Sequence, residues 1–328
     1  MIENIFLSGD IGGTKTLLQV FSAGEAQAPL LQKSYPSAAY SGLEKIIAEF
    51  LQEANVRQIT AACFALAGPV AGRKVVLTNL PWVVDADDLE SRFNIPQVSL
   101  INDFEAVGLG VAALKDNDIL VLQSGAAQVR GGRLVVGAGT GLGVAWMTWD
   151  DGQYAVHPSE GGHLDFAPGD DLQYALLQYL QARHGHVSYE RIVSGPGLAA
   201  IYEFLRDTQR AKPSAELISA FACGDGAAAV ANFAIEKQEP IAQQALQLFV
   251  QIYGAFVGNM ALAALPRGGI FIAGGIAAKI ISVMQNGEFM RAFLAKGRFT
   301  GLLTTLPMYI VTNPQIGLLG ASNAAERA

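Results

Sequence analysis

Three glycine-rich turns, each directly after an apolar run, constrain this chain more than any other feature. They are GDIGGT at residues 9–14, GAGTGLG at 137–143 and AGGI at 273–276. Glycine accepts positive φ and lets backbone N–H groups approach an anion without a Cβ in the way. A single glycine-rich turn usually only reverses the chain and does not bind a ligand. Three in one chain, with Thr14 and Thr140 as additional donors, indicate phosphate binding.

Two common nucleotide-binding patterns do not fit these turns. The sequence contains no GxxxxGK[ST] pattern. GAGTGLG matches GxGxxG loosely, but the residues after it, VAWMTW, predict a strand where a dinucleotide-binding fold needs a helix. A dehydrogenase of that fold is therefore excluded.

Hydrophobic periodicity predicts an α/β fold for the first part of the chain. The predicted strands lie at 5–9, 16–22 and 30–35, expected in one sheet, and at 59–68, 74–79 and 97–102. An amphipathic helix is predicted around 43–51, opened by a capping box of Ser41 and Glu44. Asp85 and Asp88 open a second helix. We expect this domain to end near Leu114.

The same pattern restarts after residue 114, which predicts a second, larger and more helical domain built as an internal structural echo of the first. Its predicted strands lie at 119–122, on both sides of the turn within 133–149, before the AGGI turn, and at 308–312. Its predicted helices lie at 170–183, 194–207 and 240–266. A closing helix from about 312 to 328 is expected to return to the first domain. The predicted domains are thus 1–114 with 312–328, and 115–311.

Composition narrows the possible partners and the compartment. With 22 basic and 29 acidic side chains the net charge is −7, so we expect no nucleic-acid partner. Cys63 and Cys223 are the only two cysteines, which suits a reducing compartment, and no signal-peptide pattern opens the chain. Residues 240–266 carry no charge, but glutamines on one helical face favour a buried helix over a membrane span.

Polar groups follow two of the predicted strands. Asp10 comes after the first strand, and Asn102 with Asp103 comes after the strand at 97–102. Asp103 could simply be a helix N-cap. Alternatively, because α/β sheets hold ligands at the carboxyl ends of their parallel strands, it could accept a proton from a substrate hydroxyl. Asp10 could hold Mg²⁺, directly or through water.

Glycine-rich loops carry a further set of polar side chains. Glu160 and His163 flank a glycine pair, and Glu190 follows about thirty residues later. Each carboxylate can accept two hydroxyl hydrogen bonds, which suits a polyhydroxylated ligand. These residues could equally be surface loop residues. All four histidines lie between residues 157 and 186, so zinc is a further possibility, disfavoured because no cysteine accompanies them.

Nine motifs in order resemble the bacterial glucokinase family over nearly the whole chain. They are GDIGGT, FALAGPV, LTNLPW, INDFEAVG, GAGTGLGVA, EGGHLDFAP, HGHVSYERIVSGPGL, FIAGGI and NPQIGLLG. The resemblance implies the sugar kinase fold, an α/β fold of the ribonuclease H-like or actin-like ATPase type, with a ligand cleft between a small and a larger domain. It also implies phosphorylation of the 6-hydroxyl of glucose by MgATP, and a homodimer in the cytoplasm.

The resemblance also implies a role for each site residue. Asp103 would be the general base, and the sugar would be bound by Asn102, Asp103, Glu160, His163 and Glu190. Asp10 would serve Mg²⁺. The cofactor contacts would be Asp10, Gly12, Gly13, Thr14, Gly137, Gly139, Thr140 and Gly141 for the phosphates, with Gly274 and Gly275 for the adenosine.

Two departures from related kinases stand out. Lys15 and Thr16 occupy positions where similar glucokinases usually carry Asn and a basic residue, and Lys15 would add positive charge near a phosphate. The related ROK sugar kinases share GGTK but usually carry a cysteine-rich zinc motif, and no cysteine lies between His163 and Glu190. ROK membership is therefore disfavoured.

Two alternatives to a glucokinase stay open at the level of sequence. A kinase of another hexose or of an aminosugar would use the same residue types, because one hydroxyl of difference leaves no sequence pattern. A non-catalytic sugar or nucleotide sensor is the alternative from a different class. Retention of both Asp10 and Asp103 weighs against a sensor, which has no physical need for the base.

Overall fold

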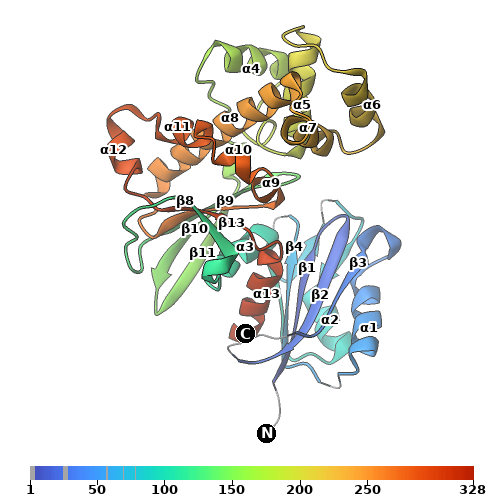
Figure 1. The fold of residues 1–328 in the computed structure, drawn as a ribbon. Coiled ribbons are helices and arrows are strands. Elements are labelled where there is room, and N and C mark those ends of the chain that lie inside the picture. Colours follow the sequence, from blue (N-terminus) through green and yellow to red (C-terminus); the bar gives the residue numbers. More distant parts are fainter. Residues whose placement is uncertain (1–3, 25–28, 57, 69, 78) are drawn as a thin grey trace. The chain divides into compact units, whose positions relative to one another are not determined.

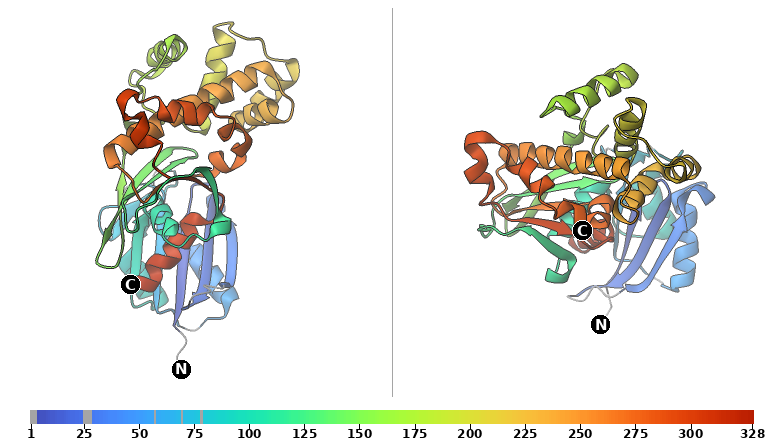
Figure 2. Two further views of the ribbon diagram at one scale, coloured as in Figure 1. Left: turned by 60° about the vertical axis from the view of Figure 1, so that its left-hand side comes forward. Right: turned by 45° about the horizontal axis from the view of Figure 1, so that its top comes forward.

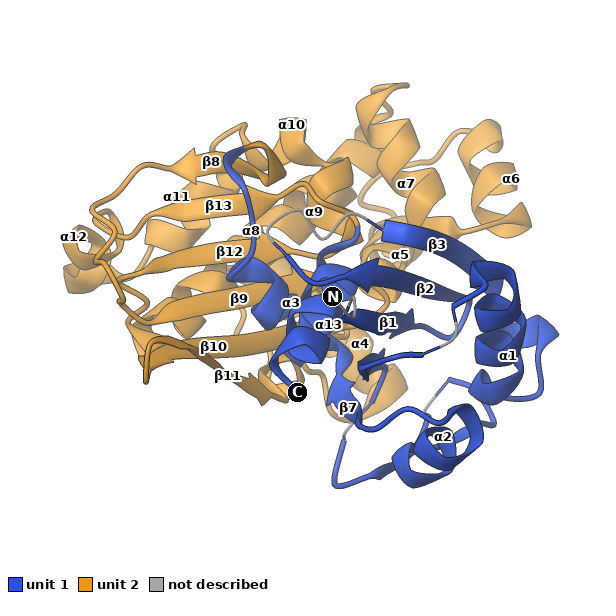
Figure 3. Cartoon of the chain, turned by 90° about the horizontal axis from the view of Figure 1, so that it is seen from below, with its two compact units in different colours: residues 1–116, 315–328 blue, residues 117–314 orange. Residues whose placement is uncertain are grey.

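The computed structural model describes residues 4–24, 29–56, 58–68, 70–77 and 79–328. The chain divides into two compact units, unit 1 with residues 1–116 and 315–328, and unit 2 with residues 117–314 (Figure 3). Pro69 and Thr78, in two of the motifs quoted above, lie outside the described residues.

Unit 1 contains a five-stranded sheet in the order β3-β2-β1-β4-β7 (Figure 1). Its strands are β1 (Ile5–Ile11), β2 (Lys15–Ser22), β3 (Pro29–Pro36), β4 (Ala61–Leu66) and β7 (Val98–Asn102). β1, β2 and β3 lie in one sheet, as predicted, where they form an antiparallel meander, and β1, β4 and β7 are parallel. β5 (Lys74–Val76) pairs with β6 (Val83–Asp85) in a separate sheet, and β6 was not predicted.

Helices cover both faces of the unit 1 sheet, so every residue of β4 is buried. The helices of this unit are α1 (Leu43–Ala54), α2 (Ala86–Phe93), α3 (Asp103–Val111) and α13 (Ile316–Arg327), with a short 3-10 turn η1 (Ser37–Ala39). On one face Phe64 and Leu66 join the apolar cluster of α1 and α2. On the other, Cys63 and Ala65 join a cluster of small side chains from α3 and α13. The side chains of β4 alternate between the two clusters because successive residues of a strand point to opposite faces of the sheet.

The predicted capping box at Ser41 is wrong. α1 begins at Leu43, and Gly42 occupies the N-cap in an extended conformation without a side-chain hydrogen bond. The buried side of the helix, which starts with Leu43 and continues through Ile46, fixes where the helix begins. Ser41 therefore lies one residue outside the capping position. By contrast, Asp85 caps α2 as predicted.

α3 and α13 pack backbone to backbone. A Cβ at Gly320 would overlap the carbonyl oxygen of Ala106, and one at Gly110 would overlap that of Ile316. The hydroxyl of Ser322 also hydrogen-bonds that of Ser8 in β1 at 2.8 Å, inside the core. Glycine at these two positions therefore sets how closely α13 approaches α3 and the sheet.

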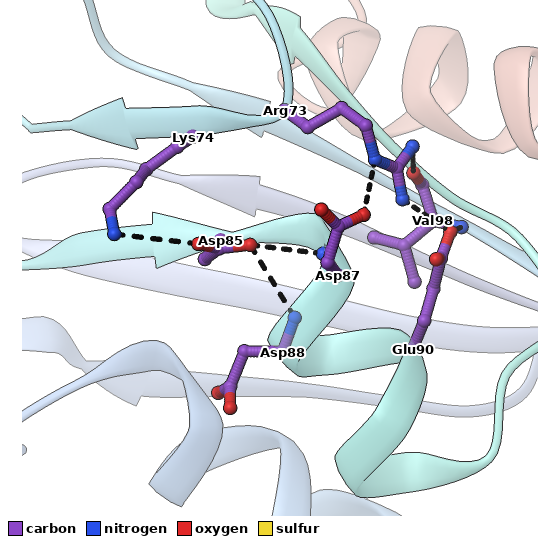
Figure 4. Close-up of polar contacts among 7 residues, drawn as sticks. All are labelled: Arg73, Lys74, Asp85, Asp87, Asp88, Glu90 and Val98. Atoms are coloured by element: carbon purple, nitrogen blue, oxygen red, sulfur yellow. Dashed lines mark hydrogen bonds and ion pairs between the residues drawn. The ribbon is translucent and has the colours of Figure 1, made fainter.

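A polar cluster joins α2 to the start of β7 (Figure 4). Arg73 forms ion pairs with Asp87 and, at 2.7 Å, with Glu90. The backbone N–H of Val98 donates to the Glu90 carboxylate at 2.8 Å. The cluster anchors β7, whose last residue is Asn102.

Unit 2 repeats the strand arrangement of unit 1. Its sheet has the order β11-β10-β9-β12-β13-β8. The strands are β8 (Ile119–Gln123), β9 (Arg133–Ala138), β10 (Leu142–Asp150), β11 (Gln153–Ser159), β12 (Gly269–Ala273) and β13 (Met308–Val311). β11, β10 and β9 form an antiparallel meander, and β9, β12 and β13 are parallel. The predicted structural echo is confirmed. β11 was not predicted.

Helices α5, α7 and α11 of unit 2 pack against one long helix, α8, shown in orange in Figure 2. The helices are α4 (Asp171–His184), α5 (Gly195–Asp207), α6 (Ala215–Cys223), α7 (Gly226–Ile235), α8 (Pro240–Ala264), α9 (Gly275–Lys279), α10 (Ile281–Met284), α11 (Glu288–Leu294) and α12 (Thr300–Leu303). Short 3-10 turns are η2 (Asp116–Asp118), η3 (Gly161–His163) and η4 (Gly297–Phe299). Among the described helices, α8 alone is long and apolar enough to cross a membrane, yet 72% of its apolar window is buried inside the protein. The prediction of a buried helix is confirmed.

The α3–α13 packing yields a first prediction. We expect Gly320→Ala to lower the free energy of unfolding by about 1–3 kcal/mol, because the new methyl forces two helix backbones apart. Urea unfolding followed by circular dichroism measures the change. The control is Gly301→Ala in α12, where a Cβ meets no atom within 4 Å. It should be neutral or slightly stabilising, since alanine favours helix. Equal loss in both variants would contradict close packing as the cause.

The Glu90 contacts yield a prediction for pH. The Val98 N–H and then the Arg73 guanidinium hold the pKa of Glu90 below its ordinary value of 4.5. A depressed carboxyl pKa adds stability above pH 4.5 that is lost as the pH falls through the folded-state pKa. Glu90→Gln should therefore cost about 1 kcal/mol at pH 7, and the difference from wild type should shrink below pH 4.5. A difference that stays constant in urea titrations from pH 7 to pH 3.5 would refute this.

Candidate active site

The first glycine turn is held by a short chain of hydrogen bonds. The N–H of Gly12 donates to the carbonyl of Lys15 at 2.9 Å, which closes the β1–β2 hairpin. Ser37 donates its hydroxyl to the carbonyl of Gly12 at 2.8 Å, and its oxygen lies 2.9 Å from that of Thr16. Thr16 and Ser37 are fully buried. Thr16 therefore supports the turn from inside, and Ser37 is a supporting residue that no sequence pattern indicated.

The tip of this turn faces outward. Thr14 and Lys15 are exposed. A Cβ at Gly13 would lie 2.9 Å from the Cβ of Asn79, so the backbone passes close to that residue. The turn thus offers backbone N–H groups, a hydroxyl and an ammonium group to a ligand, the chemistry that suits an anion.

Asp10 is the next-to-last residue of β1 and lies against the first turn of α13. A Cβ at Gly317 would be 3.0 Å from its Oδ2 atom. Burial raises the pKa of the Asp10 carboxyl above its ordinary value, and the positive charge of Lys15 partly opposes that change. The positive end of the α13 dipole also favours the carboxylate. A nearby cation would favour the charged form further.

Asn102, not Asp103, is the N-cap of α3. Its backbone is extended, and its Oδ1 accepts from the N–H groups of Phe104 at 2.8 Å and Glu105 at 3.2 Å. Its Nδ2 donates to the carbonyl of Gly68 at 2.9 Å. The N-cap interpretation of Asp103 is therefore wrong, because the helix already has its cap one residue earlier. Asp103 is the first helical residue.

Glu105 completes a capping box that sequence inspection missed. The N–H of Asn102 donates to the Glu105 carboxylate, which partly offsets the rise that burial causes in the pKa of Glu105. The N-x-x-E spacing at 102–105 was the available signal. The reciprocal bonds fix the start of α3, and with it the position of Asp103.

The parallel strands of unit 1 bring Asp10 and Asn102 to one edge of the sheet. Asp10 pairs with Ala65 in β4, and the next residue of β4, Leu66, pairs with Asn102 in β7. Two inter-strand spacings of ~4.8 Å put the two backbones roughly 10 Å apart. The carboxyl edge of this sheet therefore carries Asp10, Asn102 and Asp103 together.

In unit 2 the three polar loop residues meet. His163 Nε2 lies 3.8 Å from an oxygen of Glu160 and 3.8 Å from Oε1 of Glu190. Glu160 and His163 are exposed, whereas Glu190 is partly buried. The other oxygen of Glu190, Oε2, accepts from the N–H of Leu142 at 2.9 Å. One carboxylate oxygen thus faces the histidine while the other is fixed by the backbone.

The histidines do not form a metal centre. His157 hydrogen-bonds Thr148 at 2.8 Å, and His186 pairs with Asp165. Within residues 4–328, the gaps aside, no three or more His, Cys, Asp or Glu side chains are grouped to hold a metal ion. The geometry gives the zinc interpretation no support.

The second and third glycine turns adjoin at the edge of the unit 2 sheet. The N–H of Gly139 donates to the carbonyl of Gly141 at 2.8 Å. Gly137 pairs with Ala273, the last residue of β12. Gly274 has φ +85°, and a Cβ there would overlap the carbonyl of Ala138.

Open space lies beside this edge. A Cβ would meet no atom within 4 Å at Gly139 or at Gly275, the first residue of α9. Thr140, at the tip of the turn, is exposed. The edge therefore presents backbone N–H groups and a hydroxyl to a ligand.

The chain matches the family model described as Glucokinase over residues 7–328. It is 43% identical to a glucokinase of Nostoc punctiforme, with 98% of this chain and 99% of that one covered. A crystal structure of glucokinase from an Antarctic psychrotroph is 30% identical, with a TM-score of 0.86 and 99% of each chain covered. A ROK family glucokinase of Streptomyces griseus, in complex with glucose and AMPPNP, has a TM-score of 0.66 at 19% identity over 99% of this chain and 100% of that one, which shows the shared fold alone. With nearly the whole length covered, this chain belongs to the glucokinase family.

Proposed function

We propose that this chain phosphorylates glucose at its 6-hydroxyl with ATP, giving glucose 6-phosphate and ADP. Family membership over residues 7–328 supports the reaction. The observation that supports particular residues is the group of Glu160, His163 and Glu190. Glu190 is also hydrogen-bonded to the N–H of Leu142, directly after the second glycine turn.

The sugar is bound, in this proposal, by Asn102, Glu160, His163 and Glu190. Carboxylates accept hydrogen bonds from hydroxyl groups, and an exposed histidine and an amide can donate or accept. Glu160 and His163 are exposed and therefore accessible to a sugar. Asp103 contacts the hydroxyl that reacts.

The phosphates of ATP are bound by two glycine turns. In the turn of Gly12, Gly13 and Thr14 the N–H of Gly12 closes the hairpin, so the turn offers the backbone N–H groups of Gly13 and Thr14 beside the exposed ammonium of Lys15. The turn from Gly137 to Gly141, with the Thr140 hydroxyl, offers the second set. Gly274 and Gly275 serve the adenosine. A Cβ at Gly275 would meet no atom within 4 Å, which leaves room for a flat ligand, and Gly274 lets the chain pass close to Ala138 beside it.

Asp10 is the residue that would serve Mg²⁺, either directly or through water. Its buried carboxyl favours a cation beside it, since a positive charge offsets the cost of burying the charged form. Hard cations take oxygen ligands. When bound, the ion would neutralise charge on the phosphates of the nucleotide.

Asp103 is the general base in this mechanism. The oxygen of the 6-hydroxyl forms a bond to the γ-phosphorus while the bond from that phosphorus to the bridging oxygen of ADP breaks. The hydroxyl proton passes to the Asp103 carboxylate. The remaining residues position the reactants and stabilise charge, which supplies most of the catalysis in phosphoryl transfer.

The proposed enzyme has two domains, 1–114 with 312–328 and 115–311, and works as a homodimer in the cytoplasm without nucleic-acid or membrane partners. Family resemblance supports the dimer. The unpaired cysteines, Cys63 and Cys223, suit a reducing compartment. Size-exclusion chromatography with light scattering tests the dimer, and a mass of 34.6 kDa would refute it.

The base assignment gives a kinetic prediction. Asp103→Asn should lower kcat by about 10²-fold or more and change the KM for glucose much less, because proton transfer takes place only in the transition state. Steady-state kinetics with glucose and MgATP provides the test. Asp225→Asn, at the N-cap of α7, is the matched control, since asparagine caps a helix as well as aspartate. A kcat within about threefold of wild type would remove Asp103 as the base.

The sugar assignment gives a binding prediction. Glu160→Gln and His163→Ala should each weaken glucose binding by about tenfold, because each change weakens or removes about one hydrogen bond to the sugar. The affinity for MgATP measured without sugar should stay nearly unchanged. Isothermal calorimetry measures both. His184→Ala, an exposed histidine at the end of α4, is the control. An equal loss of MgATP affinity in the two site variants would argue against the sugar role.

A further inference from the structure

Glu190 lies where three segments of unit 2 meet. Its backbone N–H donates to the carbonyl of Gly162, in the turn that carries His163, at 2.9 Å. Its Oε2 accepts from the N–H of Leu142, directly after the glycine turn. A Cβ at Gly141 would lie 2.6 Å from that oxygen. Main chain and side chain of one residue thus hold the polar loop and the glycine turn together.

Ser194 and the residue after it form a second connection between Glu190 and the glycine turn at 137–141. Its hydroxyl donates to the carbonyl of Glu190 at 2.7 Å and accepts from the N–H of Gly197 at 3.1 Å, as the N-cap of α5. The next residue, Gly195, donates its N–H to the carbonyl of Gly139 at 2.8 Å. Ser194 is only 2% exposed, so its hydroxyl bonds are protected from water.

The two links close a ring of contacts within unit 2. Residues 190–194 connect at one end to the proposed sugar group and at the other to the proposed phosphate turn. A shift of Glu190 when its free oxygen meets a sugar hydroxyl would move Ser194 and Gly195 and so change the position of Gly139. Hydrogen-bond networks of this kind can carry coupling between two sites.

We propose that Ser194 is a positioning residue that couples sugar binding at Glu190 to nucleotide binding at the 137–141 turn. The inference rests on the proposed function and adds to it a residue that touches neither substrate. Coupling between two sites is reciprocal, so glucose should tighten nucleotide binding by the same factor by which nucleotide tightens glucose binding. For coupled sites that factor is about 5–150-fold.

The test measures the coupling factor itself. Calorimetry on the full chain gives the Kd of Mg-AMPPNP with and without saturating glucose, and the ratio of the two values is the factor. Ser194→Ala should reduce this factor to about one. Ser194→Gly should do the same at lower cost to folding, because glycine is a tolerable N-cap. Ser194→Thr keeps the hydroxyl and should restore the wild-type factor.

Ser214 provides the matched control. It is the N-cap of α6 in the same unit, and its hydroxyl accepts from the N–H of Leu217 at 3.1 Å. Because Ser214 is exposed and Ser194 is buried, Ser214→Ala should lower the melting temperature less than Ser194→Ala, and it should keep the wild-type coupling factor. If Ser194 were only a helix cap, its own variants would keep that factor as well.

The coupling role and the proposed function are overturned by different results. A wild-type factor near one, or an unchanged factor in both Ser194→Ala and Ser194→Gly, would overturn the coupling role even if the wild type phosphorylates glucose normally. Absence of glucose phosphorylation by the wild type would instead overturn the proposed function. The two failures are therefore distinguishable.

Discussion

Parallel strands that end at a common edge are the constraint on which both units depend. In unit 1 the edge formed by β1, β4 and β7 carries Asp10 and Asn102, and in unit 2 the edge formed by β9 and β12 carries the glycine turns. Groups far apart in the sequence come together because strand ends lie at the same height. Glycine is needed there because backbone approaches backbone, as Gly274 and Ala138 do.

Capping hydrogen bonds then place the side chains on these edges. The amide oxygen of Asn102 caps the start of α3, and one of its two amide N–H groups donates to the Gly68 carbonyl, which fixes the following Asp103 and leaves the second N–H for a ligand. Glu190 divides its carboxylate between the backbone of Leu142 and the side of His163. In both cases one polar residue bonds to the backbone and, in the proposed mechanism, also fixes the position of the reacting group or of the sugar-binding side chain beside it. Rigid positioning of this kind is what phosphoryl transfer demands of a protein.

Most of the fold could be predicted from the sequence, because periodicity and glycine turns are local signals, whereas the roles of the candidate site residues rest on the family resemblance and stay a prediction. Very short strands, and strands that contain residues typical of loops, could not be predicted. β6 has three residues, too few to show a period, and β11 contains Pro158, which suggests a loop. The helix cap at Gly42 depends on backbone angles, whereas the cap at Asn102 did have a sequence signal in its N-x-x-E spacing. The hydroxyl bonds of Ser37 and Ser194 depend on which carbonyl lies nearby in space.

The most direct test of the account is sugar-dependent ADP release by the purified protein with MgATP. Glucose, mannose, fructose, N-acetylglucosamine and a no-sugar blank are compared at equal concentration. The account predicts turnover that is fastest with glucose and near zero in the blank, as expected if water is excluded from the reacting phosphate. Faster turnover with another sugar would contradict the substrate assignment. Sugar binding without any turnover would contradict the enzyme itself and favour a sensor.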